Sequence, residues 1–451
     1  MSIAGGSNHL RPAGGSDEEI SRPTLSPTPS YNSSREESPV LKSPDAKETS
    51  TMLPLHAGTR SASEWSFRGG IRMLGKIGFV PGWEGLRGLA VALVMVSHVV
   101  EQKEMLGTLG VEVFFVLSGF LITGVLISQM EKNQQSSQET DGTTSTPKNL
   151  LKRFSFLPRF YMDRFVRLTP ALGLMVLVVY KIASRLGAER VMLRKDAYAA
   201  FFYTHNLYPS LPSDPRLMYP GMYLNTWSLA VEEQFYIFWS LLIPFVVPLS
   251  LKSKALVMAV LISVGFFIRD YSGWNFLTDH MYGIDYRYAY SANAWKMFIG
   301  CSARLLPVPM ICTRRWMGMI STLGFFLMTY MWGYGLTNFD FRTTGVWLEL
   351  FTALLVLLII LGSINGNPIL ESQLFRFPGR ISYSWYLWQF PLQALHGWPV
   401  GNWGPTGLAF MVATFTTFMI EEPIRNKYHA WKTRKAATHG EEEKQHARRE
   451  D

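Results

Sequence analysis

Residues 82–100 read GWEGLRGLAVALVMVSHVV, and this stretch is apolar enough to cross a membrane although it contains Glu84, Arg87 and His98. Charged and titratable groups are costly in lipid and usually have a functional reason to be there. His98 follows Arg87 by eleven positions, so both side chains fall on nearly the same helix face, about 16 Å apart along the axis. The stretch therefore predicts a membrane helix that presents two polar groups on one face.

The composition places the whole chain in the membrane class. Of its 451 residues, 48% are hydrophobic and 14% aromatic, and only 17% are charged, compared with about 25% in a typical soluble domain. The formal net charge of +9 is then explained by Lys and Arg that flank membrane spans, and no nucleic-acid partner is expected. With two cysteines and scattered histidines, the sequence predicts neither a disulfide framework nor a metal site.

Ten apolar stretches of roughly spanning length follow one another along the chain. They lie at 83–102, 110–130, 169–187, 228–248, 254–270, 291–308, 316–336, 343–363, 380–397 and 404–420. The segment at 198–208 is an eleventh candidate, but it is short for a span. The predicted fold is therefore all-α, a polytopic membrane helix bundle with about ten transmembrane helices.

Composition divides the chain into three parts. Residues 1–75 are rich in Ser, Pro, Gly and Glu and have no apolar periodicity, which predicts a disordered tail. Residues 76–425 hold the apolar stretches and form the predicted transmembrane domain. Residues 426–451 form a charged C-terminal tail.

The distribution of Lys and Arg predicts the orientation, because cytoplasmic loops carry an excess of these residues. If 198–208 does not span and the N-terminus is cytoplasmic, nearly all basic loops lie inside, and only the basic loop at 185–195 disagrees. If 198–208 spans, every later loop inverts and the rule fails repeatedly. We therefore expect both termini in the cytoplasm, with the protein in either the endoplasmic reticulum or the plasma membrane.

Glu232 and Glu233 lie inside another predicted span, within the stretch TWSLAVEEQFY at 226–236. Glu232 falls about 9 Å from the outer end of that span. This depth is close to the one expected for His98, and a carboxylate that hydrogen-bonds an imidazole raises its basicity. The alternative is that both carboxylates mark a water-exposed start of the helix.

Arg164 and Arg167 lie three residues apart on one helix face, shortly before Pro170. Clustered guanidinium groups suit a phosphate ligand, because their forked donors can bind it in two places. The plainer alternative is that this pair only marks a cytoplasmic loop, and that Arg87 is a side chain that extends from the membrane to its surface. Ser118 and Gly119 in an apolar stretch predict a close helix contact.

Together these segments resemble the acyltransferase type 3 family of multi-pass membrane O-acyltransferases. The matching elements occur in the family's order over residues 80–425: Arg87 and His98 in LRGLAVALVMVSH, FFVLSGFLI at 114–122, Arg164, Arg167 and Pro170, TWSLAVEEQFY at 226–236, ISYSWYLWQFPL at 381–392, and EEP at 421–423. The family commonly has His where this chain has Gln389, which cannot titrate near neutrality. Some members of the family carry an additional soluble domain, and we expect no counterpart of it in this chain.

The resemblance implies an enzyme that transfers an acyl group, usually acetyl, from acetyl-CoA or another acyl-CoA to a hydroxyl. It implies no permanently bound cofactor. The partners that it implies are an acyl-CoA, the lipid bilayer and a hydroxylated carbohydrate, lipid or secondary metabolite. The oligomeric state is open. We expect His98 to act as the base and Glu232 to orient it, with Arg87, Arg164 and Arg167 at the acyl-CoA. The residues expected along the acceptor path are Ser118, Gln234, Tyr236, Tyr383, Tyr386 and Trp388.

Two other classes of protein use similar residues. Intramembrane His, Arg and Glu also build the proton relays of proton-coupled transporters, although no convincing inverted halves are evident here. A catalytically inactive membrane scaffold is the third class, and Gln389 in place of the family's histidine favours it mildly.

Overall fold

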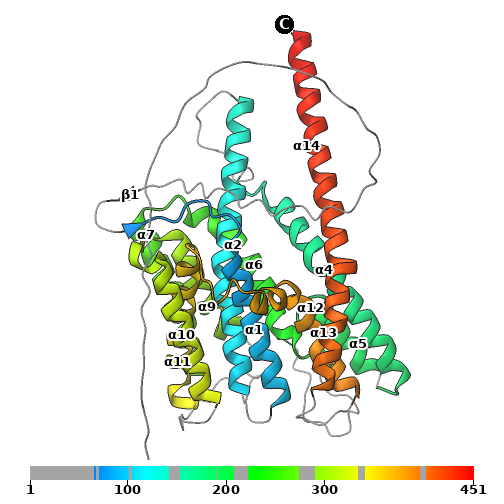
Figure 1. The fold of residues 1–451 in the computed structure, drawn as a ribbon. Helices are drawn as coiled ribbons and strands as arrows, with labels where there is room; N and C mark the ends of the chain where they lie inside the picture. The colour runs from blue at the N-terminus through cyan, green and yellow to red at the C-terminus, as the bar shows by residue number, and fades with distance from the viewer. Residues whose placement is uncertain are drawn as a thin grey trace, which may run out of the picture. The chain divides into compact units, whose positions relative to one another are not determined.

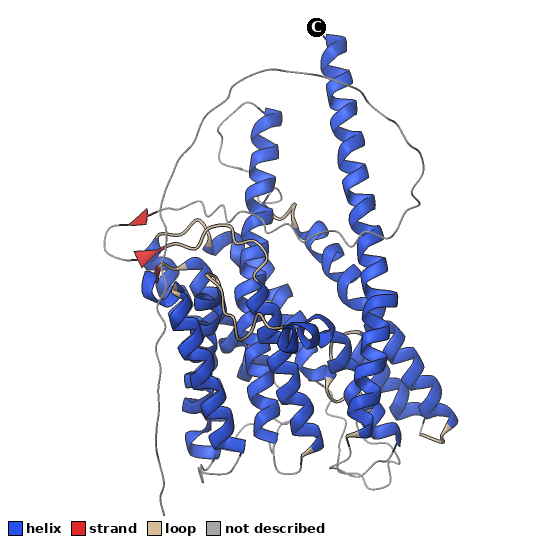
Figure 2. Ribbon diagram, viewed as in Figure 1, coloured by secondary structure: helices blue, strands red, loops and turns tan. Residues whose placement is uncertain are grey.

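The computed structural model describes residues 66–67, 71–100, 104–141, 153–188, 190–207, 222–273, 290–333, 341–396 and 403–450. Most of the predicted disordered tail at 1–75 lies outside these residues. The described residues form a bundle of helices, drawn by chain order in Figure 1 and by secondary structure in Figure 2. Three two-residue strands, β1 (Ser66–Phe67), β2 (Ile71–Arg72) and β3 (Val308–Pro309), form a small antiparallel sheet in that order.

Each predicted apolar stretch coincides with a helix, which confirms the all-α prediction apart from the small sheet. The helices are α1 (Pro81–Val99), α2 (Glu104–Asp141), α4 (Leu157–Arg185), α5 (Arg190–Phe201), α6 (Thr226–Val246), α7 (Leu251–Gly273), α9 (Tyr290–Leu305), α10 (Arg315–Gly333), α11 (Phe341–Ser363), α12 (Gln373–His396), α13 (Gly404–Thr416) and α14 (Glu422–Glu450). A 3₁₀ turn at Met310–Thr313 precedes α10, and a π-helical turn at Thr417–Glu421 joins α13 to α14.

Six helices among the described residues are long and apolar enough to cross a membrane. Their apolar segments are Leu106–Asn133, Leu157–Arg185, Thr226–Val246, Leu251–Arg269, Val346–Ser363 and Gly404–Lys435. The predicted number of ten spans therefore stays a prediction. One of the remaining helices, α9, has only 16 residues, fewer than the roughly 20 that a span usually needs.

Helix α4 begins earlier than the span predicted at 169–187. It starts at Leu157 and continues through Pro170, which lies inside the helix although proline removes one backbone hydrogen bond there. Arg164 and Arg167 are consequently part of the helix rather than of a loop before it. Helix α5 has only 12 residues and ends at Phe201, so it covers the first part of the candidate eleventh segment.

Direct backbone contact fixes α1 against α12. A Cβ atom added at Gly88 would collide with the carbonyl oxygen of Phe375 in α12, and one added at Gly85 with that of Leu370, just before α12 begins. At the start of the same contact, Arg376 Nε donates to Glu84 Oε2 at 3.0 Å. Because lipid supplies no hydrophobic drive between helices, such close approach of small residues is a main source of packing energy.

The predicted close contact at Ser118 and Gly119 is confirmed between α2 and α9. A Cβ atom at Gly119 would collide with the carbonyl oxygen of Met297, and one at Gly300 with that of Val116. Helix α1 also packs extensively against α2, and the two run side by side in the centre of Figure 1. The backbone of α1 is therefore held from both sides.

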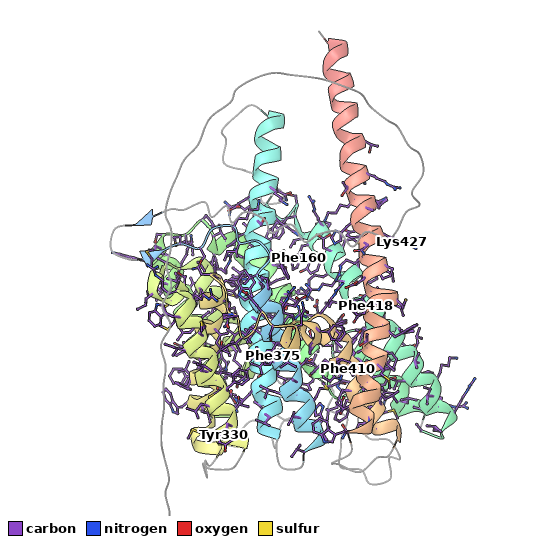
Figure 3. The ribbon with its side chains drawn as sticks, viewed as in Figure 1. Phe160, Tyr330, Phe375, Phe410, Phe418 and Lys427 are labelled. Atoms are coloured by element: carbon purple, nitrogen blue, oxygen red, sulfur yellow. The ribbon has the colours of Figure 1, made fainter. Side chains whose placement is uncertain are left out.

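Aromatic rings fill the space between the helices, as the side chains in Figure 3 show. Phe375 of α12 packs against Phe326 of α10 with ring centroids 5.9 Å apart. Phe377 of α12 contacts Phe410 of α13 and Phe418 of the π-helical turn at 5.9 and 6.4 Å. These contacts join α12 to helices on two sides.

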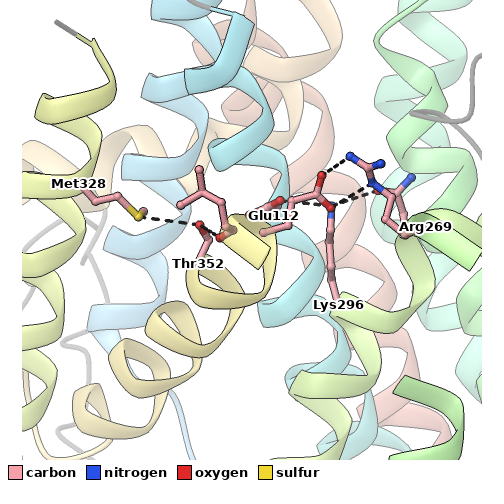
Figure 4. Close-up of polar contacts among 8 residues, drawn as sticks. Glu112, Arg269, Lys296, Met328 and Thr352 are labelled. Atoms are coloured by element: carbon pink, nitrogen blue, oxygen red, sulfur yellow. Dashed lines mark hydrogen bonds and ion pairs between the residues drawn. The ribbon is translucent and has the colours of Figure 1, made fainter. Parts of the chain in front are cut away.

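A buried charge cluster, formed by Glu112, Arg269, Lys296 and Glu349, joins α2, α7, α9 and α11 (Figure 4). Lys296 Nζ lies 3.2 Å from Glu112 Oε1 and 2.9 Å from Glu349 Oε2, while Arg269 Nη2 lies 2.5 Å from Glu349 Oε1. Each of the four side chains is at most 7% exposed. Two carboxylates thus face two cations, which limits the cost of their burial.

Replacement of Gly88 by alanine should destabilise the protein by about 1–3 kcal/mol, because the added methyl group overpacks the contact between α1 and α12. Thermal unfolding of the detergent-purified protein measures the effect. Gly407→Ala is the matched control, because an added Cβ at Gly407 meets no atom within 4 Å. Equal unfolding midpoints for the two variants would contradict the assigned role of this contact.

Removal of one cation from the buried charge cluster should also destabilise the protein. We expect Lys296→Met to cost about 3–5 kcal/mol, since it leaves Glu112 without its ion-pair partner. Lys252→Met serves as the control, because Lys252 is exposed at the start of α7. An unfolding midpoint of Lys296→Met that matches this control would show that the cluster contributes nothing to stability.

Candidate functional site

A central cavity of about 380 Å³ lies between α1, α2, α4, α6, α12 and α14. Most of the predicted site residues line it: Arg87, Ser118, Arg164, Arg167, Glu232, Tyr236, Tyr383 and Tyr386. These residues come from five helices and from distant parts of the chain. His98, Gln234 and Trp388 are not among the lining residues.

Glu232 of α6 faces the central cavity and is held by two hydroxyl groups. Ser118 Oγ of α2 donates to Glu232 Oε1 at 3.1 Å, and Tyr236 Oη, one helical turn further along α6, donates to Glu232 Oε2 at 3.4 Å. Ser118 and Tyr236, which we expected to contact the acceptor, therefore hold the orientation of this carboxylate.

Arg164 of α4 has its charge compensated by Glu233 of α6. Its Nη2 lies 2.6 Å and its Nε 3.2 Å from Glu233 Oε1, and the guanidinium carbon lies 3.8 Å from the centre of the Tyr236 ring. Ion-pair and cation–π contacts of this kind fix the position of a guanidinium group. Arg164 consequently ties α4 to α6 at the wall of the cavity.

Arg87 and Arg167 lack a direct ion-pair partner of this kind among the described residues, although Glu421 interacts with both at longer range. Both line the central cavity and lie close enough to interact electrostatically, yet neither forms an ion pair in the part of the chain that the structure describes. The Nε atom of Arg87 is buried and has no hydrogen-bond partner there. Two neighbouring, unpaired guanidinium groups on one cavity wall form a site suited to an anion.

A second, larger cavity of about 690 Å³ adjoins the central cavity and shares Arg87, Arg167, Tyr383 and Arg425 with it. We call it the basic vestibule, because seven Lys and Arg residues and only three Glu residues line it. The basic residues are Lys76, Arg87, Lys132, Arg167, Arg304, Arg380 and Arg425. This excess of basic over acidic side chains favours a polyanion as ligand.

Tyr383 and Tyr386 of α12 use their hydroxyl groups to anchor neighbouring helices. Tyr383 Oη donates to the carbonyl oxygen of Leu168 on α4 at 2.9 Å, and Tyr386 Oη donates to that of Asn225 at 2.9 Å. Tyr386 Oη also lies 2.8 Å from Ser228 Oγ. Both rings form part of the cavity wall, while their hydroxyl groups serve packing.

Trp388 and Gln389 lie away from the central cavity. Trp388 is buried in the apolar cluster that α4, α5, α12 and α13 share. Gln389 is buried as well, and its Nε2 donates to Thr406 Oγ1 of α13 at 2.8 Å. In this structure both residues contribute to the packing of α12.

Gln234 supports the cavity wall from behind. Its Nε2 donates to the carbonyl oxygen of Tyr203 at 2.9 Å, and its amide exchanges hydrogen bonds with Asn206 at 2.8 and 3.0 Å. These contacts hold the turn after α5, where Tyr203 adopts a positive φ of 55°. Tyr203, and not Gln234, reaches the central cavity.

His98 lies near the end of α1, where its ring packs edge-on against Phe390 at 5.6 Å. Its Nδ1 is buried and has no hydrogen-bond partner in the described part of the chain. Val94 and Met95, one turn earlier, belong to the same apolar cluster as the cavity residues Val111 and Phe115. His98 does not line the central cavity, and Glu232 bonds to Ser118 and Tyr236 instead of His98.

The sequence did not indicate that α14 contributes to the cavity. Arg425, Tyr428 and His429 line it, although the predicted boundary of the membrane domain falls at 425. Tyr428 Oη and Lys432 Nζ both lie close to Asp163 Oδ1 of α4, at 2.8 and 2.7 Å. The EEP motif at 421–423, directly before these residues, was the one signal that pointed to this region.

Comparison with known proteins gives a consistent family match. A family model described as "Acyltransferase domain", that of the type 3 acyltransferases, matches residues 80–420. The chain is 29% identical over 376 residues to "Peptidoglycan O-acetyltransferase OatA" of Listeria monocytogenes serovar 1/2a, which covers 77% of this chain and 56% of that protein.

Two staphylococcal proteins give similar values. The chain is 27% identical over 376 residues to "O-acetyltransferase OatA" of Staphylococcus aureus strain NCTC 8325, covering 77% of this chain and 58% of that protein. It is 26% identical over 380 residues to a putative O-acetyltransferase of strain COL, covering 78% of this chain and 57% of that protein. The chain thus spans little more than half the length of these relatives. No solved structure matches the chain.

Proposed function

Because the chain belongs to the acyltransferase type 3 family, we propose that it is a membrane O-acetyltransferase that takes acetyl groups from acetyl-CoA. The observation that carries this proposal is the unpaired arginine pair, Arg87 and Arg167, at the inner end of the basic vestibule. Coenzyme A carries three phosphate groups, and guanidinium groups bind phosphate through two parallel hydrogen bonds. The donor would enter through the vestibule and direct its thioester into the central cavity.

The vestibule also supports the proposed orientation. Five of its seven basic residues lie before α1, late in α2 and α9, early in α12 and at the start of α14, which are the helix ends that we assign to the cytoplasm. Acetyl-CoA is available on that side. We therefore propose ten spans with both termini cytoplasmic, in the endoplasmic reticulum or the plasma membrane.

The transfer needs a base at the acceptor hydroxyl. The hydroxyl oxygen attacks the thioester carbon while a base removes its proton, and the carbon–sulfur bond then breaks to release the thiolate of CoA, which takes up a proton. We propose His98 as this base, because its buried Nδ1 has no competing partner in the described residues. Neighbouring arginines would stabilise negative charge that develops on the thioester oxygen.

Glu232 is the second proposed catalytic residue. Its carboxylate faces the central cavity, and two hydroxyl groups fix its direction. A direct bond from Glu232 to His98 would require one of these hydroxyl contacts to break and His98 to move to the cavity wall. The pair would therefore form only when substrate occupies the cavity.

Arg87→Gln and Arg167→Gln should each raise the KM for acetyl-CoA by about tenfold to a hundredfold, the effect of one lost charge-assisted hydrogen bond. Acetyl transfer from labelled acetyl-CoA in membranes, together with equilibrium binding of CoA, measures the change. Arg315→Gln is the matched control, because Arg315 is exposed and lines none of these cavities. Unchanged binding in the Arg87 and Arg167 double variant would rule out the proposed donor site.

His98→Ala should lower kcat by a factor of about 10² to 10⁴, the usual contribution of a general base. The affinity for CoA should stay unchanged, because His98 lies away from the arginine pair, and intact binding also shows that the variant folds. A double-mutant cycle with Glu232→Gln tests the proposed coupling in kcat. Retained activity of His98→Ala excludes it as the base, and additive losses exclude a direct pair.

A further inference from the structure

A third cavity, which we call the lateral cleft, opens on the side of the bundle. It has a volume of about 440 Å³ and lies between α4, α6 and the turn after α5. Arg164, Leu168, Tyr203 and Glu233 line both the lateral cleft and the central cavity. A single layer of side chains therefore separates the proposed reaction chamber from the outer surface of the bundle.

The outer rim of the lateral cleft is apolar. Met162 and Phe165 of α4 line the cleft and are 51% and 59% exposed. Phe202, beside Tyr203 in the adjoining turn, is 63% exposed. Both residues of α4 belong to Leu157–Arg185, a segment that is long and apolar enough to span a membrane, so this exposed rim suits contact with lipid tails.

The inner end of the cleft is polar, which distinguishes it from an ordinary lipid-facing groove. The ion pair of Arg164 and Glu233 lies there, and each side chain is 16% exposed. Arginine carries five N–H donors, and Glu233 engages it through Nε and Nη2 only. The remaining donors of Arg164 and the free lone pairs of Glu233 can satisfy both the oxygen and the proton of a hydroxyl group.

Tyr203 holds the partition in an unusual backbone conformation. A φ of 55° is costly for a residue with a large side chain, and it persists only where neighbouring contacts enforce it. Gln234 and the backbone bond from Thr204 to the carbonyl oxygen of Ala199 provide those contacts. The tyrosine ring is thereby fixed in the wall that both cavities share.

We propose that the lateral cleft admits the acetyl acceptor from the bilayer, and that this acceptor is an amphiphile with a hydroxyl head group and a long hydrocarbon chain. The head group meets Arg164 and Glu233, and the chain lies along Met162 and Phe165. This inference rests on the proposed acetyl transfer and narrows its acceptor to a lipid-borne hydroxyl. The transferred acetyl group forms an ester with that hydroxyl, and CoA leaves as the thiol.

Photolabelling tests the inference without any need for turnover. The full-length protein in liposomes is labelled with 1-hexadecanol that carries a diazirine in the middle of its chain, and the labelled peptides are identified by mass spectrometry. We expect saturable labelling within residues 158–169. Excess 1-hexadecanol should compete with the probe, whereas hexadecane should not, because only the alcohol can bond to Arg164 and Glu233.

A matched pair of variants controls for general contact with lipid. Phe165→Gln should weaken saturable labelling about tenfold through the loss of apolar contact, while Phe351→Gln should leave it unchanged. Phe351 of α11 is 56% exposed and lines none of the three cavities. Labelling that is spread evenly over exposed helices, or equal competition by hexadecane, would overturn the inference.

The labelling experiment and the test of the proposed acetyl transfer can fail separately. If labelling is as expected but labelled acetyl-CoA gives no transfer to any acceptor, the cleft stands as a site for a lipid alcohol and the proposed acetyl transfer fails. If acetyl transfer occurs but saturable labelling at 158–169 is absent, the lateral route is wrong and the proposed transfer remains.

Discussion

The contact between the backbones of α1 and α12 is the constraint on which the rest of the site depends. Gly88 lies directly against the carbonyl oxygen of Phe375 in α12, and Gly379 of α12 against that of Glu84 in α1, so the two helices can neither separate nor rotate without loss of this fit. Arg87 lies in the same turn of α1 as Gly88. Because the glycine side of the helix faces α12, the rotation of α1 is fixed, and Arg87 points into the cavity. On the other side, α2 holds α1 and brings Ser118 to Glu232. The chemistry therefore depends on small residues that take no part in it.

Charge compensation separates the structural from the functional groups in this bundle. The buried charge cluster balances two carboxylates with two cations, and Glu233 balances Arg164. An ionised group without a partner is expensive inside a membrane protein. Arg87 and Arg167 bear that cost in the described residues, and the cost is understandable if a ligand supplies the missing negative charge. The same comparison is the reason why we propose a neutral hydroxyl group, and not a phosphate, as the ligand of Arg164.

Much of the fold could be predicted because apolar segments of spanning length leave few alternatives to a helix. The residues of the central cavity were predictable where they interrupted such a segment, as Arg87 and Glu232 do. Gln234 could not be assigned in this way, because its partners belong to the turn after α5, which no periodicity predicts. The charge cluster was missed for a related reason: Lys296 and Glu349 lie on separate helices, and only packing brings them together.

The partnership of α1 with α12 also has a consequence for biosynthesis. The ion pair between Glu84 and Arg376 joins residues that are 292 positions apart in the sequence. At typical rates of synthesis, about 15–60 s pass between the emergence of the first residue and that of the second. During this interval α1 waits in the membrane with a charged face and a glycine surface that its final neighbour does not yet cover. Until α12 has been made, α1 can therefore be held only from the side of α2.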